Sequence, residues 1–473
     1  MESLILKNGF VVDPINNVLG IHDLGIYEGK IDSIKENIDP DLSSEVIDLN
    51  GKIVMPGHID THAHLSSIGG DTWGEDRSYG HKMIAESGTT TVLDLAGNPL
   101  LMIEGMKKRG AGLNVACITG LQPGTTIPSE EPKIDEIRDV VYKEKKNGAI
   151  GLKIVGGYHP FSSEITSDII FQANNQQAWI ALHVGTKDAG SNILGLRDVP
   201  NITDKGRLHV AHINSYARGL INTVEEESNE ALNLINKMRN QWVTEAYLAQ
   251  INGTNGLCNE DGDLVFNVAI NCMVARGYEP NEKGIRNALK DGYGSALVMK
   301  EGRMILVSGE DALEIWESNL TNQALCFPVN SPISAFMLTT SKYSDGEFII
   351  DAISTDGGAL PRNVAIEKTM SLVNFGALSL DDAVMKLSYN PSRMLGLENR
   401  GHFTEGAEAD ITIIDQNIGK AVMSFVKGKM IMKDGMSLMN GGNWLILSEG
   451  KELAEKSGLP FEILDLSKSK LYL

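Results

Sequence analysis

The middle of the chain, from about residue 58 to 395, alternates short apolar runs with longer stretches of helical character. The apolar runs read as buried strands; examples are 89–94, 150–155, 179–183 and 208–213. Strands that alternate with helices indicate a parallel sheet, and the length suits a (β/α)₈ barrel of the TIM type. The sequence therefore predicts an α/β fold built around such a barrel.

Both ends of the chain have a different pattern, in which short strands are separated by Asn-Gly and Glu-Gly turns. We expect residues 1–57 and 396–445 to form one small β-sandwich domain, interrupted by the barrel. A long stretch, about 252–329, reads as an inserted subdomain or lid. Residues 446–473 are expected to form a C-terminal tail.

The chain has 473 residues and a formal net charge of −20, with an isoelectric point near 5.0. Nucleic acids and anionic membranes bind positive surfaces, so this charge argues against both and favours a small-molecule partner. The four cysteines lie far apart without a Cys-X-X-Cys pair, and no apolar run reaches about 18 residues. We therefore expect a cytoplasmic protein without disulfides, signal peptide or membrane span.

Two histidines, His62 and His64, follow the apolar run 53–55 and the pair Pro56-Gly57. Residues at alternate positions of a strand point the same way, so both imidazoles would converge on one spot. Neutral imidazole is the commonest side-chain metal ligand. The pair alone is equally compatible with polar residues at a strand end.

Further polar residues interrupt or follow later strands, where a barrel gathers its catalytic groups. His183 ends one strand, and Asp356 stops another in a Gly-rich turn, where it could bind metal or cap the turn. His209 and His212 differ by three positions, so only one should face the barrel interior. We choose His212, because it leads into a polar loop, and expect His209 to face the helical layer.

Lys153 stands inside an apolar strand, where an unpaired ammonium would cost several kcal/mol. It could pair with a buried carboxylate or extend to water at the rim. A neutral lysine could also react with CO₂ to give a carbamate, which can bridge two metal ions.

Taken together, these residues resemble the pattern of the amidohydrolase superfamily, and most closely its cyclic amidohydrolases: hydantoinases, dihydropyrimidinases and dihydroorotases. The resemblance spans about residues 1 to 435. It rests on His183, His212 and the segments 56–64, 151–153, 354–357, 390–393 and 406–410.

The resemblance implies a site for two divalent metal ions, usually zinc. The implied ligands are His62, His64 and Asp356 for one ion, His183 and His212 for the other, and carbamylated Lys153, formed with CO₂ or bicarbonate, between them. Two such ions would lower the pKa of water and polarise the substrate carbonyl. Asp356 would then take a proton and pass it to the leaving nitrogen.

Tyr158 lies five residues after Lys153, an offset at which hydantoinase-like enzymes place a tyrosine that hydrogen-bonds the developing oxyanion. Such a donor contributes roughly 2.7–4 kcal/mol. The alternative is an aromatic side chain packed at the barrel mouth. Many relatives are dimers or tetramers, so a homo-oligomer is expected by analogy.

The chain also departs from its relatives. Dihydroorotases carry an arginine two residues after the second histidine, where this chain has Ser66. D-aminoacylases place a cysteine ligand near the end of the second strand, and residues 92–98 contain none. Insertions like 252–329 also occur in acyl-amino-acid deacylases, so the substrate stays open.

Arginines and asparagines in the barrel loops are candidates for substrate binding. Arg362 and Arg218 could fork onto a substrate carboxylate or be exposed without a ligand. Asn98 and Asn363 could hydrogen-bond an imide or serve turns. His159 could contact substrate or solvent.

The leading hypothesis is a binuclear amidohydrolase that cleaves a C–N bond in a small cyclic amide or ureide. The nearest rival is an N-acyl-amino-acid deacylase. A non-catalytic scaffold is a third possibility, because fold alone proves nothing, but all six ligand types are present. A deaminase of the same superfamily is disfavoured by Lys153, because those sites are typically mononuclear.

Overall fold

Eight parallel strand segments form the centre of the computed structural model, which describes residues 3–68, 71–72, 79–204 and 206–473. They are β6 (His58–His64), β9 (Thr89–Gly97), β10 (Asn114–Gly120), β11 (Gly151–Val155), β12 (Trp179–His183), β13 (Leu208–Val210), β14 (Trp242–Tyr247) and β19 (Ala352–Ser354). Each pairs in parallel with the next. The short β20 (Gly357–Gly358) follows β19 and pairs with β6, so the path returns to its first strand. The predicted TIM-like barrel is confirmed.

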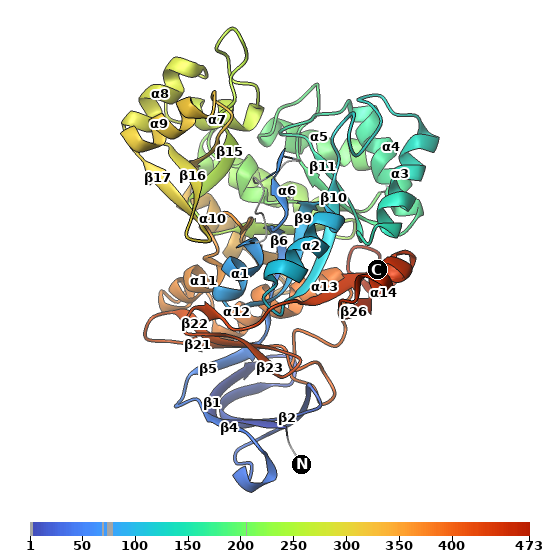
Figure 1. Ribbon diagram of the computed structural model, residues 1–473, viewed down its shortest axis with the longest axis vertical. Helices are drawn as coiled ribbons and strands as arrows, with labels where there is room; N and C mark the ends of the chain where they lie inside the picture. The colour runs from blue at the N-terminus through green and yellow to red at the C-terminus, as the bar shows by residue number, and fades with distance from the viewer. Residues whose placement is uncertain (1–2, 69–70, 73–78, 205) are drawn as a thin grey trace.

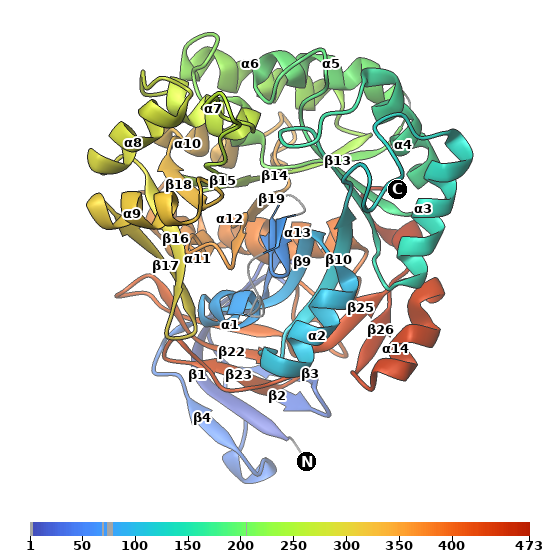
Figure 2. The same cartoon turned by 45° about the horizontal axis from the view of Figure 1, so that its top comes forward.

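Helices between the strands form the outer layer, and Figure 2 shows α3 to α6 arranged outside the strands. The helices of this layer are α1 (Tyr79–Glu86), α2 (Pro99–Arg109), α3 (Ile134–Lys146), α4 (Ser163–Asn175), α5 (Ile193–Thr203), α6 (Val224–Lys237), α10 (Pro332–Thr340) and α11 (Ala365–Asn374). Strand alternation separates two cores. Ile180 and Leu182 of β12 pack with the helices, whereas Trp179 and Ala181 belong to the inner core. The same alternation turns His183 inward.

Strands from both ends of the chain join in one nine-stranded sheet below the barrel (Figure 1). They are β1 (Leu4–Asp13), β2 (Val18–Tyr27), β3 (Lys30–Lys35), β4 (Val46–Asp48), β5 (Ile53–Pro56), β21 (Ile411–Asp415), β22 (Lys420–Val426), β23 (Lys429–Lys433) and β24 (Met436–Ser437). The two ends meet where β5 pairs antiparallel with β21, with Val54 opposite Ile413. Only Gly57 separates β5 from β6, so this sheet anchors the first barrel strand.

In the sequence, the segment between β14 and α10 forms a separate four-stranded sheet, which lies at the upper left of Figure 1. Its segment contains β15 (Ile251–Asn255), α7 (Asn267–Val274), α8 (Glu282–Lys290), β16 (Ser295–Lys300), β17 (Arg303–Ser308), α9 (Glu310–Ser318) and β18 (Ala324–Pro328). The segment has its own apolar core, which includes Trp316, Leu325 and Phe327. Its first and last residues, Ile251 and Pro328, pair with each other. We call this segment the insertion and the Ile251–Pro328 pair its neck.

The C-terminal part of the chain packs back onto the barrel. It contains α12 (Leu380–Val384), a π-helical turn (Met385–Tyr389), α13 (Asn390–Leu395), β25 (Asn443–Ile446), α14 (Lys451–Ser457) and β26 (Phe461–Ile463). β25 pairs in parallel with β10 and β26 with β25, which extends the barrel sheet. The remaining short elements are β7 (Ser67–Ile68), β8 (Asp71–Thr72) and the 3₁₀ turns Pro40–Leu42, Ile213–Tyr216, Ser448–Gly450 and Leu466–Lys468. Among the described residues, no helix has the length and apolar character needed to cross a bilayer.

Candidate metal centre

Five side chains of metal-ligating type and Lys153 meet at the carboxyl ends of the barrel strands. They are His62 and His64 of β6, Lys153 of β11, His183 at the end of β12, His212 two residues after β13, and Asp356 two residues after β19. All six are buried. Five of them, together with the side chain of Tyr158, line one small cavity. We call these six residues the six-donor cluster.

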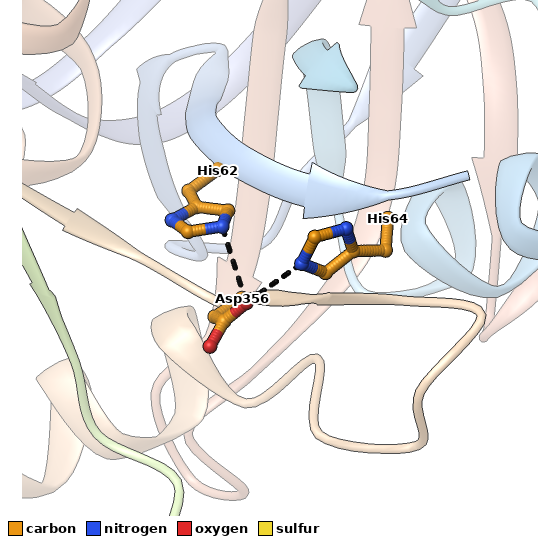
Figure 3. Close-up of side chains that lie close together, drawn as sticks. All are labelled: His62, His64 and Asp356. Carbon is orange, nitrogen blue, oxygen red and sulfur yellow. Dashed lines mark hydrogen bonds and ion pairs between the residues drawn. The ribbon is translucent and has the colours of Figure 1, made fainter. Parts of the chain in front are cut away.

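The tightest group within the cluster is His62, His64 and Asp356, whose ligand atoms all lie within 4.8 Å of one another. Figure 3 shows both imidazoles directed at the carboxylate. Asp356 Oδ1 is 3.2 Å from His62 Nε2 and 3.0 Å from His64 Nε2. The predicted convergence of the two histidines is thus observed, and the carboxylate that joins them comes from the opposite end of the barrel sequence.

Lys153 lies beside this group, with its Nζ 3.1 Å from His62 Nε2. Burial lowers the pKa of Lys153 to about 8. About a tenth of the amine is therefore neutral at pH 7, far more than for an ordinary lysine. That neutral amine is the form that reacts with CO₂, so the environment suits the predicted carbamate.

His183 and His212 complete the cluster on its other side. Their ring centroids are 4.5 Å apart, and His212 stacks on His62 with centroids 5.0 Å apart. Burial lowers the pKa of both rings well below the ordinary value, so both are the neutral, metal-binding form. His183 Nε2 lies 2.9 Å from Ser191 Oγ, whereas the buried Nδ1 of His212 has no hydrogen-bond partner among the described residues.

Glu245 of β14 contacts the cluster, and the sequence reasoning gave it no role. Its side chain is buried, and its Oε1 lies 2.7 Å from His62 Nδ1 and accepts a hydrogen bond from the His212 backbone N–H at 2.6 Å. Its Oε2 accepts from Ser354 Oγ at 2.5 Å. Burial alone would raise the pKa of Glu245, but His62 and His209 hold it well below its ordinary value. An ionised carboxylate at Nδ1 fixes the His62 ring so that Nε2 faces the cluster, as in other metal sites.

The expectation that His209 faces the helical layer is wrong. His209 Nδ1 accepts a hydrogen bond from Trp179 of the inner core, and its Nε2 lies 3.7 Å from Glu245. Both His209 and His212 reach the interior because β13 ends at Val210 and His212 has a left-handed backbone, with φ of 36°. The alternation of side-chain direction along a strand therefore does not extend from His209 to His212.

Tyr158 stands above the cluster with its ring at the edge of the His183 ring, with centroids 5.9 Å apart. Its hydroxyl donates to the Gly253 carbonyl of the insertion at 3.3 Å. Burial raises the pKa of the phenol, which therefore remains a proton donor. The geometry is compatible with the predicted oxyanion donor, once substrate replaces the carbonyl of Gly253.

Of the residues predicted to bind substrate, the structure brings only Arg362 to the described lining of this cavity. Arg362 lines it and pairs with Asp356 at 2.7 Å. Arg218 binds Asn330 at 2.9 Å, close to the neck. Asn98 accepts backbone hydrogen bonds at the start of α2, and the amide of Asn363 pairs with both backbone groups of Gly358. His159 is half-buried beside Tyr158 and is not among the described residues that line the cavity.

Ser66 stands where dihydroorotases carry arginine, and its hydroxyl donates to Asp94 Oδ2 at 2.6 Å. Asp94 also accepts from the Leu65 backbone N–H at 3.0 Å, and burial raises its pKa to about 6. The Ser66 side chain is therefore engaged in a polar contact within the protein.

The donor set fits a divalent metal. Histidine nitrogens and a carboxylate are ligands that zinc and similar ions take, and a second shell is present in Glu245. The imidazoles of His183 and His212, both held neutral by burial, would add nitrogen donors beside this group. The sequence prediction of a divalent metal site is thus supported by the donor geometry.

Comparisons with known proteins agree with this reading. A family model described as "Amidohydrolase family" matches residues 340–451. A dihydroorotase of Elusimicrobium minutum (strain Pei191) is 23% identical over 450 residues, covering 87% of this chain and 88% of that protein. Among solved structures, a D-aminoacylase matches with a TM-score of 0.65 at 17% identity, covering 94% and 100% of the two chains. A dihydropyrimidinase from Brevibacillus agri NCHU1002 matches with a TM-score of 0.59 at 14% identity, covering 94% and 98%.

The barrel, the His-His-Asp group and these matches define the class of the protein, a metal-dependent hydrolase that acts on C–N bonds. The resemblance to the amidohydrolase superfamily, and within it to the cyclic amidohydrolases, is confirmed.

Proposed function

We propose that the protein is a binuclear amidohydrolase that opens a small cyclic amide or ureide at its C–N bond. The observation that carries the proposal is the meeting of the six-donor cluster around one cavity. The three donors of its tightest group, His62, His64 and Asp356, lie close enough together to share one ion.

Two divalent ions, for which zinc is our first choice, would be held by the cluster. The proposed ligands are His62, His64 and Asp356 for one ion, His183 and His212 for the other, and carbamylated Lys153 for both. When bound, the ions would supply Lewis acidity to the substrate carbonyl and lower the pKa of water.

The chain's own groups would move and stabilise the charges of the reaction. The Asp356 carboxylate lies at the cavity and would carry a proton from the attacking water to the leaving nitrogen. Tyr158 would donate its phenol hydrogen to the oxygen that develops negative charge. Val155, Val268 and Leu360 also line the cavity and would exclude water around the substrate.

A cyclic amide or ureide without a carboxylate is favoured over dihydroorotate, because Ser66 cannot hold a substrate carboxylate as arginine does. The rival substrate class, N-acyl amino acids, is supported by the insertion over the site and by the likeness to D-aminoacylase. Arg218 and Arg362 would then be the candidate carboxylate ligands, and Asn98, Asn363 and His159 further contacts.

The test is to incubate purified enzyme, loaded with zinc and bicarbonate, with a panel of cyclic imides and N-acyl amino acids. Ring opening gives one product of substrate mass plus water, whereas deacylation gives two products, and mass spectrometry separates these outcomes. Metal content measured on the same sample should approach two ions per chain. A protein that binds no metal and hydrolyses none of these substrates would contradict the proposal and favour the non-catalytic scaffold.

Assembly and domain limits are part of the same proposal. We propose a β-sandwich domain from residues 1–57 and 396–445, a barrel from 58–395 with a lid at 252–329, and a tail from 446–473. A homo-oligomer, dimer or tetramer, in the cytoplasm remains our expectation, and sedimentation velocity would test the oligomeric state.

A further inference from the structure

Arg362 joins the catalytic aspartate to the insertion. Its Nη2 lies 2.7 Å from Asp356 Oδ2, and its Nε donates to the Asp356 carbonyl oxygen. Its Nη1 donates to the Ile251 carbonyl at 3.0 Å, in the neck of the insertion. The side chain is only 3% exposed. Each of its three nitrogens therefore has a protein partner, which is a different use from binding a substrate carboxylate.

The insertion closes the cavity over the six-donor cluster. Asn252 and Gly253 of β15 and Val268 of α7 line the cavity, and Gly253 accepts the Tyr158 hydroxyl. The cavity has a volume of about 30 Å³, enough for only one or two waters. A cyclic amide or an N-acyl amino acid is larger, so groups that line the cavity, among them those of the insertion, have to shift before substrate enters.

We propose that Arg362 is a positioning residue that couples closure of the insertion to the orientation of Asp356. The proposal rests on the proposed function, in which Asp356 carries the proton. A guanidinium is planar, so a partner held at Nη1 fixes the direction of Nη2 and Nε as well. With the insertion seated, the Ile251 carbonyl holds that plane, and both the carboxylate and the carbonyl of Asp356 are held with it.

The backbone of Asp356 has an unusual conformation that the contacts of Arg362 help to hold. Its φ is 47°, in the left-handed region that non-glycine residues seldom adopt. The Ile251 carbonyl also accepts from Asn330 Nδ2 at 3.2 Å. Opening of the insertion that displaces the neck would cost Arg362 its third partner and give the carboxylate rotational freedom. The proton-carrying group is therefore fully oriented only when the site is closed over a substrate.

The first test compares Arg362→Lys and Arg362→Ala in the metal-loaded enzyme. Lysine keeps the charge beside Asp356 but cannot hold two partners in one plane. We expect kcat to fall about 100-fold with KM little changed, equally for neutral and carboxylated substrates. Added methylguanidinium should restore part of the lost kcat in Arg362→Ala. A rise in KM confined to carboxylated substrates, with kcat retained, would instead make Arg362 a substrate ligand and overturn the proposal.

The second test uses a native thiol and needs neither metal nor activity. Cys326 of β18 is buried against Ala359 and Leu360, on the segment that follows Asp356. Its reaction with N-ethylmaleimide, followed by peptide mass spectrometry, reports separation of the insertion from the barrel. We expect about tenfold faster labelling in Arg362→Lys, because a charge-assisted hydrogen bond to the neck is lost. Cys117, buried in β10, is the internal reference and should not change.

Arg286→Lys is the matched control, because Arg286 pairs with Glu282 inside the insertion at 2.6 Å. It should leave both kcat and Cys326 labelling unchanged. If Arg362→Lys does not accelerate Cys326 labelling, the coupling is wrong, whatever the activity shows. If labelling accelerates but the wild-type enzyme hydrolyses none of the panel, the proposed function fails while the tie between Arg362 and the insertion stands.

Discussion

Two buried polar clusters lie at opposite ends of the barrel strands, and they differ in how completely the protein satisfies them. At the amino ends, Arg400 binds Asp410 at 2.8 Å and Glu462 at 2.8 and 2.9 Å. Asp410 also accepts from Asn114 and from the Lys427 backbone N–H, each at 2.8 Å. We call these residues the base cluster.

The six-donor cluster at the carboxyl ends lacks this completeness. Buried Nδ1 atoms of His64 and His212 have no partner in the described part of the chain, and Lys153 is pushed toward its neutral form. The complete set of partners around Arg400 fits a structural role, and the six-donor cluster, with its convergent donors, fits a site for a ligand. In TIM barrels the face at the carboxyl ends of the strands carries the active site, and the opposite face contributes to stability. The two clusters agree with this division.

The largest expected effect comes from exchanging one carboxylate in each cluster. Asp356→Asn should lower kcat about 10²–10⁴-fold, because it removes the proton carrier. Asp410→Asn should instead lower the free energy of unfolding by about 3 kcal/mol, because a buried arginine loses a charged partner. Turnover per folded molecule and urea unfolding curves measure the two effects. Equal loss of turnover in folded Asp410→Asn would break the comparison.

The next effect concerns the oxyanion donor. Tyr158→Phe should lower kcat about 10²–10³-fold with little change in KM. Tyr343→Phe is the control, because Tyr343 stacks under Arg239, away from the cavity. Steady-state kinetics on the substrate found in the panel would decide, and an unaltered kcat in Tyr158→Phe would leave Tyr158 as a packing residue.

The next comparison is between two buried glutamates, and the quantity measured is metal affinity. Glu245→Gln should weaken metal binding 10–100-fold, because His62 loses its carboxylate partner. Glu227→Gln should leave metal affinity unchanged, since Glu227 only accepts backbone hydrogen bonds at 219, 221 and 222. Competition with a chromophoric chelator measures both. Equal affinities in the two variants would contradict the role of Glu245.

The smallest effect is a pH dependence of carbamate formation. With the pKa of Lys153 near 8, about a tenth of the amine is neutral at pH 7 and about half at pH 8. Because only the neutral amine reacts, the initial rate of reactivation of CO₂-depleted apoenzyme should rise about fivefold over this interval. The assay keeps dissolved CO₂ constant and adds metal after a fixed delay. A rate that falls with pH would exclude a carbamate on Lys153.

Part of the site was predictable, because several of its donors follow a local rule, while the complete set came from the family resemblance. His62 and His64 alternate on one strand, and His183 ends another. The barrel itself followed from apolar runs of regular spacing. These signals depend on neighbours a few residues away in the chain.

What failed depended on contacts between distant segments. Glu245 was given no role, because its partner His62 is far away in the sequence and comes close only when the barrel closes through β19 and β20. His209 was misplaced because the strand stops early and His212 turns left-handed. The parallel pairing of β25 with β10 joins residues 114 and 443, which no local pattern indicates.

The neck of the insertion has a consequence for protein engineering. Ile251 and Pro328 are paired neighbours, and the Asn330 backbone N–H donates to the Gln250 carbonyl at 3.0 Å. The segment between them thus leaves and re-enters the barrel at one point, while the apolar core around Trp316 stays within it. The insertion can therefore be exchanged as a cassette. The exchange would replace the part of the cavity wall that lies over the same proposed metal ligands, and would change substrate preference without redesign of the barrel.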